Sequence, residues 1–134
     1  MQYLSAEEIL ILHALVVDET GGSHGVRDVH LLASIAHKPQ SQFGGNELYP
    51  NLHMKAAILL EAIANYHVFV DGNKRTSLIT AARFLALNGY QFTATNADAE
   101  KTILAVATKK LDVKELASWL KKNSKNIPRK RGSR

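Results

Sequence analysis

Two apolar segments in the middle of the chain constrain the fold more than any other feature. They read "MKAAILLEAIAN" (residues 54–65) and "LITAARFLAL" (residues 78–87), and each carries apolar residues around most of a helical circumference. A surface helix needs only one apolar stripe, so helices of this kind belong in the centre of a core. A length of 134 residues allows one such core. We therefore predict a single all-α domain built around two central helices.

The chain between these segments, residues 66–77, carries a cluster of polar residues. Its central part, "HVFVDGNKR", runs from His67 to Arg75 and is called the motif segment below. It must form the connection between the two central helices, and its last residues must open the second one. A polar cluster between two core-forming helices indicates a chemical role.

Boundary signals predict further helices on both sides. Ser5 with Glu8, and Asp112 with Glu115, have the spacing of a capping box. The predicted helices run from Ser5 to Gly21, from a cap at Asp28 over residues 29–38, from about Asn51 to Tyr66, from Asn73 to Asn88 before Gly89, from a cap at Asn96, and from Asp112 to about Leu120. Residues 39–50 are predicted to form a loop, and residues 90–95 are predicted to be extended or a short strand.

The positive charge is concentrated at the C-terminal end. The net charge is +5, yet the chain after Leu120 holds seven Lys or Arg and no acid. We therefore divide the chain into a helical domain (1–120) and a basic, disordered tail (121–134), whose last residues could derive from an expression vector. Such a tail is either simply solvated or a contact site for RNA or DNA.

Cysteine is absent, which excludes disulfides, zinc–thiolate sites and cysteine nucleophiles. The absence fits a reducing cytoplasm. The first residues, "MQYLSAEEIL", carry acids where a signal peptide has a basic region. We expect a cytoplasmic protein without a membrane segment.

The residue types of the motif segment suit phosphate chemistry. A helix N-terminus presents unpaired N–H groups to an anion, and Gly72 lets the backbone approach a ligand closely. Asn73, Lys74 and Arg75 add an amide donor, a point charge and a forked guanidinium. Beside a phosphate site, the carboxylate of Asp71 would hold Mg²⁺.

His67 supplies the remaining group that phosphate transfer to a hydroxyl needs. An imidazole titrates near neutral pH and can act as the general base for a hydroxyl nucleophile. A base, a metal-binding carboxylate and a phosphate site together indicate phosphoryl or nucleotidyl transfer. Taken singly, His67 could instead be a core histidine, Asp71 or Asn73 a helix cap, and Lys74 and Arg75 a solvated first turn.

The motif segment resembles the signature of the Fic/Doc family in its Doc form, H-x-F-x-(D/N)-(A/G)-N-K-R, and matches it at every specified position. The order of helices and the early "GVRDVHLLASI" resemble the death-on-curing toxins of toxin–antitoxin modules over most of residues 1–120. The resemblance implies a Fic-like helical bundle with the active-site loop between two central helices.

The resemblance also implies roles for single residues. His67 would be the general base, Asp71 would bind Mg²⁺, and Phe69 would fix the loop to the core. The predicted catalytic residues are His67, Asp71, Lys74 and Arg75. The residues predicted to bind the phosphates of ATP are Gly72, Asn73, Lys74, Arg75 and Thr76.

Two departures from the related Fic signature, H-P-F-x-x-G-N-G-R-x-x-R, bear on the reaction. Lys74 replaces its second glycine, and Leu78 replaces its final arginine. These changes argue against AMP transfer and match the Doc type. That type transfers the γ-phosphate of ATP to elongation factor Tu and arrests translation.

Regulation is expected from another protein. No glutamate of this chain completes the inhibitory (S/T)-x-x-x-E-(G/N) helix of many Fic proteins. The resemblance implies a separate antitoxin with a disordered segment that folds on binding. We also expect loop 39–50 to help receive the target protein.

Two alternatives to the kinase remain open from the sequence. One is a Fic-type AMP transferase acting on a protein hydroxyl. The other is a non-catalytic module that binds an antitoxin-like partner, or binds nucleic acid through residues 121–134.

Overall fold

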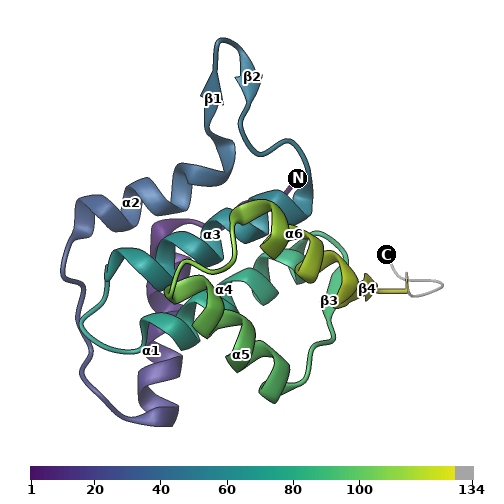
Figure 1. The fold of residues 1–134 in the computed structure, drawn as a ribbon. Helices are drawn as coiled ribbons and strands as arrows, with labels where there is room; N and C mark the ends of the chain where they lie inside the picture. The colour runs from purple at the N-terminus through teal and green to yellow at the C-terminus, as the bar shows by residue number, and fades with distance from the viewer. Residues whose placement is uncertain (129–134) are drawn as a thin grey trace.

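The computed structural model describes residues 1–128, in which six α-helices and four short strands form (Figure 1). The elements are α1 (Ala6–Thr20), α2 (Val29–His37), the 3₁₀ turn η1 (Lys38–Gln40), β1 (Gln42–Phe43), β2 (Asn46–Glu47), α3 (Leu52–Tyr66), α4 (Asn73–Leu87), β3 (Tyr90–Phe92), α5 (Asn96–Ala107), α6 (Val113–Lys122) and β4 (Ser124–Asn126). The prediction of an all-α domain is confirmed. Within the described residues, no helix is both long enough and apolar enough to span a bilayer.

Helices α3 and α4 occupy the positions predicted for the two apolar segments. Helix α3 lies in the middle of the molecule and packs against α4, α5 and α6 (Figure 1). Nine of its residues are buried, from Lys55 to Ala64. Helix α4 packs along α3 and buries Phe84 and Leu85 in the same core. The motif segment is therefore held between two elements that the core fixes in place.

The predicted capping interactions form, with one exception. Ser5 and Glu8 cap α1 reciprocally, and Asp112 and Glu115 do the same for α6. Helix α5, however, is capped by Thr95, whose side chain accepts a hydrogen bond from the N–H of Asp98. The predicted cap, Asn96, is the first helical residue. Threonine and asparagine are both good caps, so adjacent candidates are hard to separate by sequence.

The predicted loop 39–50 contains an antiparallel hairpin, which projects from the helical body (Figure 1). Strands β1 and β2 pair Gln42 with Glu47. The hairpin is anchored at its base by Lys55, a buried residue whose ammonium group donates to Glu47 Oε1 at 2.7 Å and to the carbonyl of Pro39 at 2.8 Å. By contrast, the side chain of Phe43 is 79% exposed.

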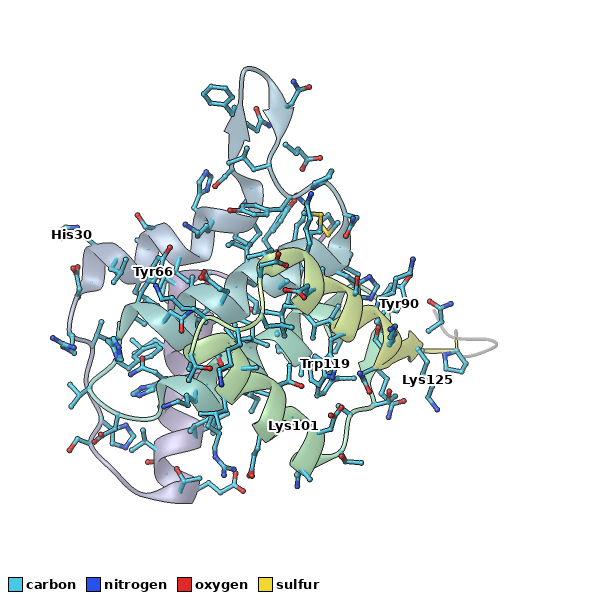
Figure 2. All side chains as sticks on the ribbon, viewed as in Figure 1. His30, Tyr66, Tyr90, Lys101, Trp119 and Lys125 are labelled. Atoms are coloured by element: carbon cyan, nitrogen blue, oxygen red, sulfur yellow. The ribbon has the colours of Figure 1, made fainter. Side chains whose placement is uncertain are left out.

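The predicted division after Leu120 requires a correction, because the chain stays in the fold beyond that residue. Helix α6 continues to Lys122, and β4 then pairs with β3. Figure 2 labels Tyr90 and Lys125, which lie on these two strands. His53 contacts Ser124 Oγ through Nε2 at 2.9 Å and joins β4 to the start of α3. Residues 129–134 of the predicted tail lie outside the described residues.

Candidate active site

The motif segment begins where α3 ends. His67 terminates α3 in a left-handed conformation, with φ 52° and ψ 46°, which is uncommon for a residue that carries a Cβ atom. The next residues, Val68 and Phe69, are fully buried and attach the segment to the core. The side chain of His67 is exposed. The imidazole therefore lies at the surface, while the residues before it in α3 and after it in the motif segment are anchored in the core.

The segment ends at the N-terminus of α4, which is built to receive an anion. Gly72 precedes the helix with φ 76°, a region that favours glycine, and no side chain in the described part of the chain caps this end. Within residues 1–128, the N–H groups of Gly72, Asn73, Lys74 and Arg75 donate no hydrogen bond. Unpaired N–H groups and the positive end of the helix dipole both favour a negatively charged ligand.

A cavity of about 390 Å³ brings the predicted catalytic residues together. Its lining consists of Ala64, His67, Val70, Asp71, Gly72, Asn73, Lys74 and Arg75. The four residues predicted to be catalytic thus surround one space at the N-terminus of α4. We call this space the motif cavity.

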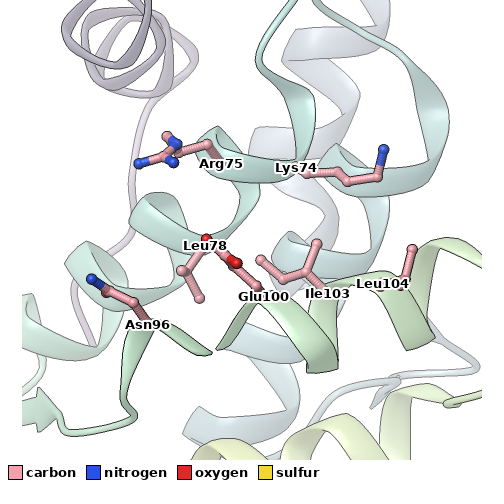
Figure 3. A pocket seen from close by; sticks show the side chains of 7 residues that line it. All are labelled: Lys74, Arg75, Leu78, Asn96, Glu100, Ile103 and Leu104. Carbon is pink, nitrogen blue, oxygen red and sulfur yellow. The ribbon is translucent and has the colours of Figure 1, made fainter. Parts of the chain in front are cut away.

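A second cavity of about 380 Å³ adjoins the first, because Lys74 and Arg75 line both. Its other walls come from Leu78 on α4 and from α5 (Figure 3). The α5 residues are Asn96, Glu100, Ile103 and Leu104. The lining of the second cavity is the more apolar of the two, and Lys74 and Arg75 are common to both.

The chain between α1 and α2 holds Asp71 from the side. The N–H of Ser23 donates to Asp71 Oδ2 at 2.8 Å. The backbone on either side of Phe69 also pairs with this connection, through hydrogen bonds from Arg27 N–H to Val68 O and from Val70 N–H to Gly25 O. The glycine-rich connection therefore orients the carboxylate without neutralising its charge.

The donor set at Asp71 fits Mg²⁺. Within the described residues, no group of three or more His, Asp or Glu side chains could form a complete protein cage for a metal. Mg²⁺ is commonly held by one or two carboxylates, with water and substrate phosphates as its remaining ligands. Asp71 supplies a single carboxylate beside the unpaired N–H groups of α4, which is consistent with this mode of Mg²⁺ binding.

Two predicted phosphate ligands are placed differently from the others. The side-chain amide of Asn73 bonds to the backbone of Phe69, accepting its N–H at 3.0 Å and donating to its carbonyl at 2.9 Å. Thr76 is fully buried, its hydroxyl has no hydrogen-bond partner among residues 1–128, and the residue is not part of the lining of either cavity. Asn73 thus closes the loop, and the Thr76 side chain is not among the groups that face the motif cavity.

His13 contacts the motif segment, and sequence reasoning did not place it there. This α1 residue is buried, and its Nε2 lies 2.7 Å from the carbonyl oxygen of Asp71. Its ring stacks on Phe69, with centroids 3.9 Å apart and planes 6° apart. In the sequence, His13 interrupts an apolar helix face, which is the one signal that sets it apart.

The chain matches a family of known proteins over the region that carries this geometry. A sequence model of the Fic/DOC family matches residues 3–85, more than half of the chain, and that span includes the whole motif segment. The chain belongs to the Fic/Doc family. The resemblance stated from the motif segment is confirmed.

Two relatives agree on the Doc branch of the family. The chain is 39% identical over 121 residues to the protein named Toxin Doc of Mycolicibacterium smegmatis, covering 89% of this chain and 91% of that protein. It is 33% identical over 122 residues to Protein kinase doc of Escherichia phage P1, covering 91% of this chain and 95% of that protein. A match over about nine tenths of the chain must reach beyond residue 85, where the match to the family model ends.

Proposed function

We propose that this protein is a Doc-type toxin kinase that transfers the γ-phosphate of ATP to a hydroxyl of elongation factor Tu and thereby arrests translation. The observation that carries the proposal is the motif cavity, in which His67, Asp71, Lys74 and Arg75 surround the free N-terminus of α4. The names of the two relatives, a toxin and a protein kinase, support it.

His67 is proposed as the general base. Its exposed imidazole lines the motif cavity and can meet a hydroxyl of a second protein. As the hydroxyl oxygen forms its bond to the γ-phosphorus, its proton passes to the imidazole. The bond from the γ-phosphorus to the bridging oxygen breaks, and ADP leaves.

The backbone and the two cations would bind the phosphates. Four consecutive N–H groups, from Gly72 to Arg75, lack partners within the described chain and are available to phosphate oxygens. Lys74 and Arg75 line both cavities, so their charges can act on a triphosphate that extends from one to the other. Positioning and charge stabilisation of this kind account for most of the catalysis of phosphoryl transfer.

Asp71 is the residue that would hold Mg²⁺, which would neutralise phosphate charge when bound. Its Oδ2 accepts the Ser23 N–H, and this contact fixes the direction of the carboxylate. The protein would therefore supply one oriented carboxylate, that of Asp71, and the phosphates would occupy the motif cavity beside it.

Lys74 favours phosphate transfer over AMP transfer. It stands where the Fic-type signature has glycine, and it is one of the residues that line both cavities. We infer that a cation at this position favours the nucleotide orientation in which the γ-phosphate, and not the α-phosphate, meets the hydroxyl. AMP transfer is the competing outcome of the experiment below.

The proposal includes an antitoxin partner and a cytoplasmic site of action. The chain encodes no inhibitory helix of the Fic type, so a separate protein with a segment that folds on binding would inhibit it. Elongation factor Tu works in the cytoplasm, and the kinase would have to meet it there.

Labelling in a bacterial lysate tests the proposal. The protein is added with Mg²⁺ and ATP labelled at either the α- or the γ-phosphate, and His67→Ala serves as the control. The proposal predicts one abundant translation factor labelled only from the γ-position and only by the unchanged protein. Label from the α-position would indicate AMP transfer. No His67-dependent label would favour a non-catalytic binding protein.

A further inference from the structure

The buried histidine on α1 contacts the motif segment but has no part in the chemistry proposed above. His13 is 1% exposed, and its Nε2 lies 2.7 Å from the carbonyl oxygen of Asp71. A carbonyl oxygen can only accept, so Nε2 must carry the proton and donate it. The stacked contact with Phe69 keeps the imidazole plane fixed.

This hydrogen bond determines the orientation of one peptide group. The peptide that joins Asp71 to Gly72 is planar and trans, so its N–H points away from its C=O. The C=O is directed into the protein, towards α1 and His13. The N–H of Gly72 must therefore point outwards, on the side where Gly72 lines the motif cavity.

Within residues 1–128, the bond from His13 is the only hydrogen bond made to the C=O or the N–H of this peptide group. The Gly72 N–H donates no hydrogen bond there, and the Asp71 carbonyl has His13 as its partner. The next carbonyl, that of Gly72, is already fixed by the Thr76 N–H at 2.9 Å, as part of α4. Gly72 can adopt more backbone conformations than other residues, so a peptide beside it needs an external restraint.

We propose that His13 is a positioning residue, which holds the Asp71–Gly72 peptide so that the Gly72 N–H faces the motif cavity and binds a phosphate oxygen of the nucleotide. The proposal rests on the function proposed above, because it assigns that phosphate-binding role to one amide. It differs from an ordinary core role, in which His13 would only fill space and satisfy a buried carbonyl.

The amide resonance of Gly72 is the most direct readout. ATP with Mg²⁺ is titrated into the ¹⁵N-labelled protein, and the ¹H–¹⁵N shift of Gly72 is followed in wild type and in three variants. His13→Phe keeps an aromatic ring against Phe69 but cannot donate. His13→Gln keeps a donor but loses the ring. His53→Phe removes a histidine contact to Ser124 outside the site and is the matched control.

We expect a large Gly72 shift in wild type and in His53→Phe, a much smaller one in His13→Phe, and partial recovery in His13→Gln. The value of kcat/KM for ATP should fall by about 10- to 100-fold in His13→Phe, the usual scale for a misplaced catalytic group. Melting temperatures of the four proteins report separately on folding.

The outcomes separate the two proposals. Equal Gly72 shifts in wild type and His13→Phe would overturn the positioning role and leave the kinase proposal intact. Equal losses in His13→Phe and His13→Gln, matched by equal losses in melting temperature, would also overturn it, because packing alone would explain them. No Gly72 shift in wild type would contradict nucleotide binding at this amide and the proposed function with it.

Discussion

The side-chain amide of Asn73 forms two hydrogen bonds with the backbone of Phe69, with Oδ1 accepting the N–H at 3.0 Å and Nδ2 donating to the carbonyl at 2.9 Å. Phe69 is fully buried. The first residue of α4 is therefore tied to the buried anchor of the motif segment. Asp71 and Gly72 lie between the two tied residues, so this pair of bonds fixes the part of the loop that carries the metal and phosphate ligands.

Replacing Asn73 by alanine should lower both stability and activity. Two hydrogen bonds to a buried backbone are lost, which costs about 1–3 kcal/mol in the free energy of unfolding. The value of kcat/KM for ATP should fall as well, because Asp71 and Gly72 are no longer held between Phe69 and the start of α4. Urea unfolding and a phosphate-transfer assay measure the two effects.

Asn88 provides a matched control for this prediction. Its amide also bonds to backbone, accepting from Gln2 N–H and donating to the carbonyls of Gln2 and Phe84, but it lies at the far end of α4. Asn88→Ala should lose comparable stability and keep its activity. If both variants keep full activity, loop closure by Asn73 has no catalytic importance.

Asp71→Asn should weaken the dependence on Mg²⁺ without releasing the loop. The amide oxygen can still accept the Ser23 N–H, but the charge that favours Mg²⁺ is lost. The Mg²⁺ concentration for half-maximal activity should rise by at least about 10-fold. Asp18→Asn, which alters an exposed carboxylate bonded to His24, is the control. An unchanged Mg²⁺ requirement in Asp71→Asn would remove Asp71 from the metal site.

The hairpin should contribute to target recognition through its exposed apolar side chains. Phe43 is 79% and Leu48 is 48% exposed, so both side chains are available for apolar contacts with a second protein. Replacing both with serine should raise the KM for the target protein by about 10-fold, the effect expected for apolar contacts at an interface. The KM for ATP should not change. An unchanged KM for the target would show that these two side chains take no part in recognition.

Glu47 has to be kept in that experiment, because it pairs with buried Lys55. Within the described residues, Glu47→Ala leaves the ammonium of Lys55 with the Pro39 carbonyl as its remaining hydrogen-bond acceptor, at a cost of about 1–3 kcal/mol. We expect a lower melting temperature for Glu47→Ala and an unchanged one for the serine double variant. The reverse pattern would contradict the anchoring role of Lys55.

His53 should make stability depend on pH. Partial burial and the nearby charge of Lys121 lower the pKa of His53, so the unfolded chain takes up the proton more readily than the folded protein. The stability from neutral His53 is complete above the ordinary pKa of about 6.5 and is lost as the pH falls through the lowered value. His53→Gln should lose less free energy of unfolding than wild type between about pH 7 and about pH 5. Parallel losses in urea unfolding at the two pH values would contradict this.

Local signals account for the parts of the fold that the sequence predicted. A cap such as Ser5 with Glu8 works within one helical turn, and the apolar circumference of α3 is visible in a few turns of sequence. The motif segment is equally local, so its residues could be assigned to one cavity from their order alone. Each of these features depends on residues that are neighbours in the chain.

The features that sequence reasoning missed depend on distant partners or on the exact path of the loop. His13 and Asp71 are 58 positions apart, and no pattern in α1 indicates which carbonyl its histidine will contact. Strand β4 has no alternation of apolar residues and forms because β3 offers it an edge. The amide of Asn73 could equally have faced a ligand, and only the path of the loop turns it towards Phe69.

The intact mass of elongation factor Tu tests the central claim most directly. The purified factor is incubated with this protein, ATP and Mg²⁺, and in parallel with the His67→Ala variant. The proposal predicts a gain of about 80 Da, one phosphate, that depends on His67. A gain of about 329 Da, the mass of AMP, or an unchanged mass under conditions where a Doc relative modifies the factor, would contradict it.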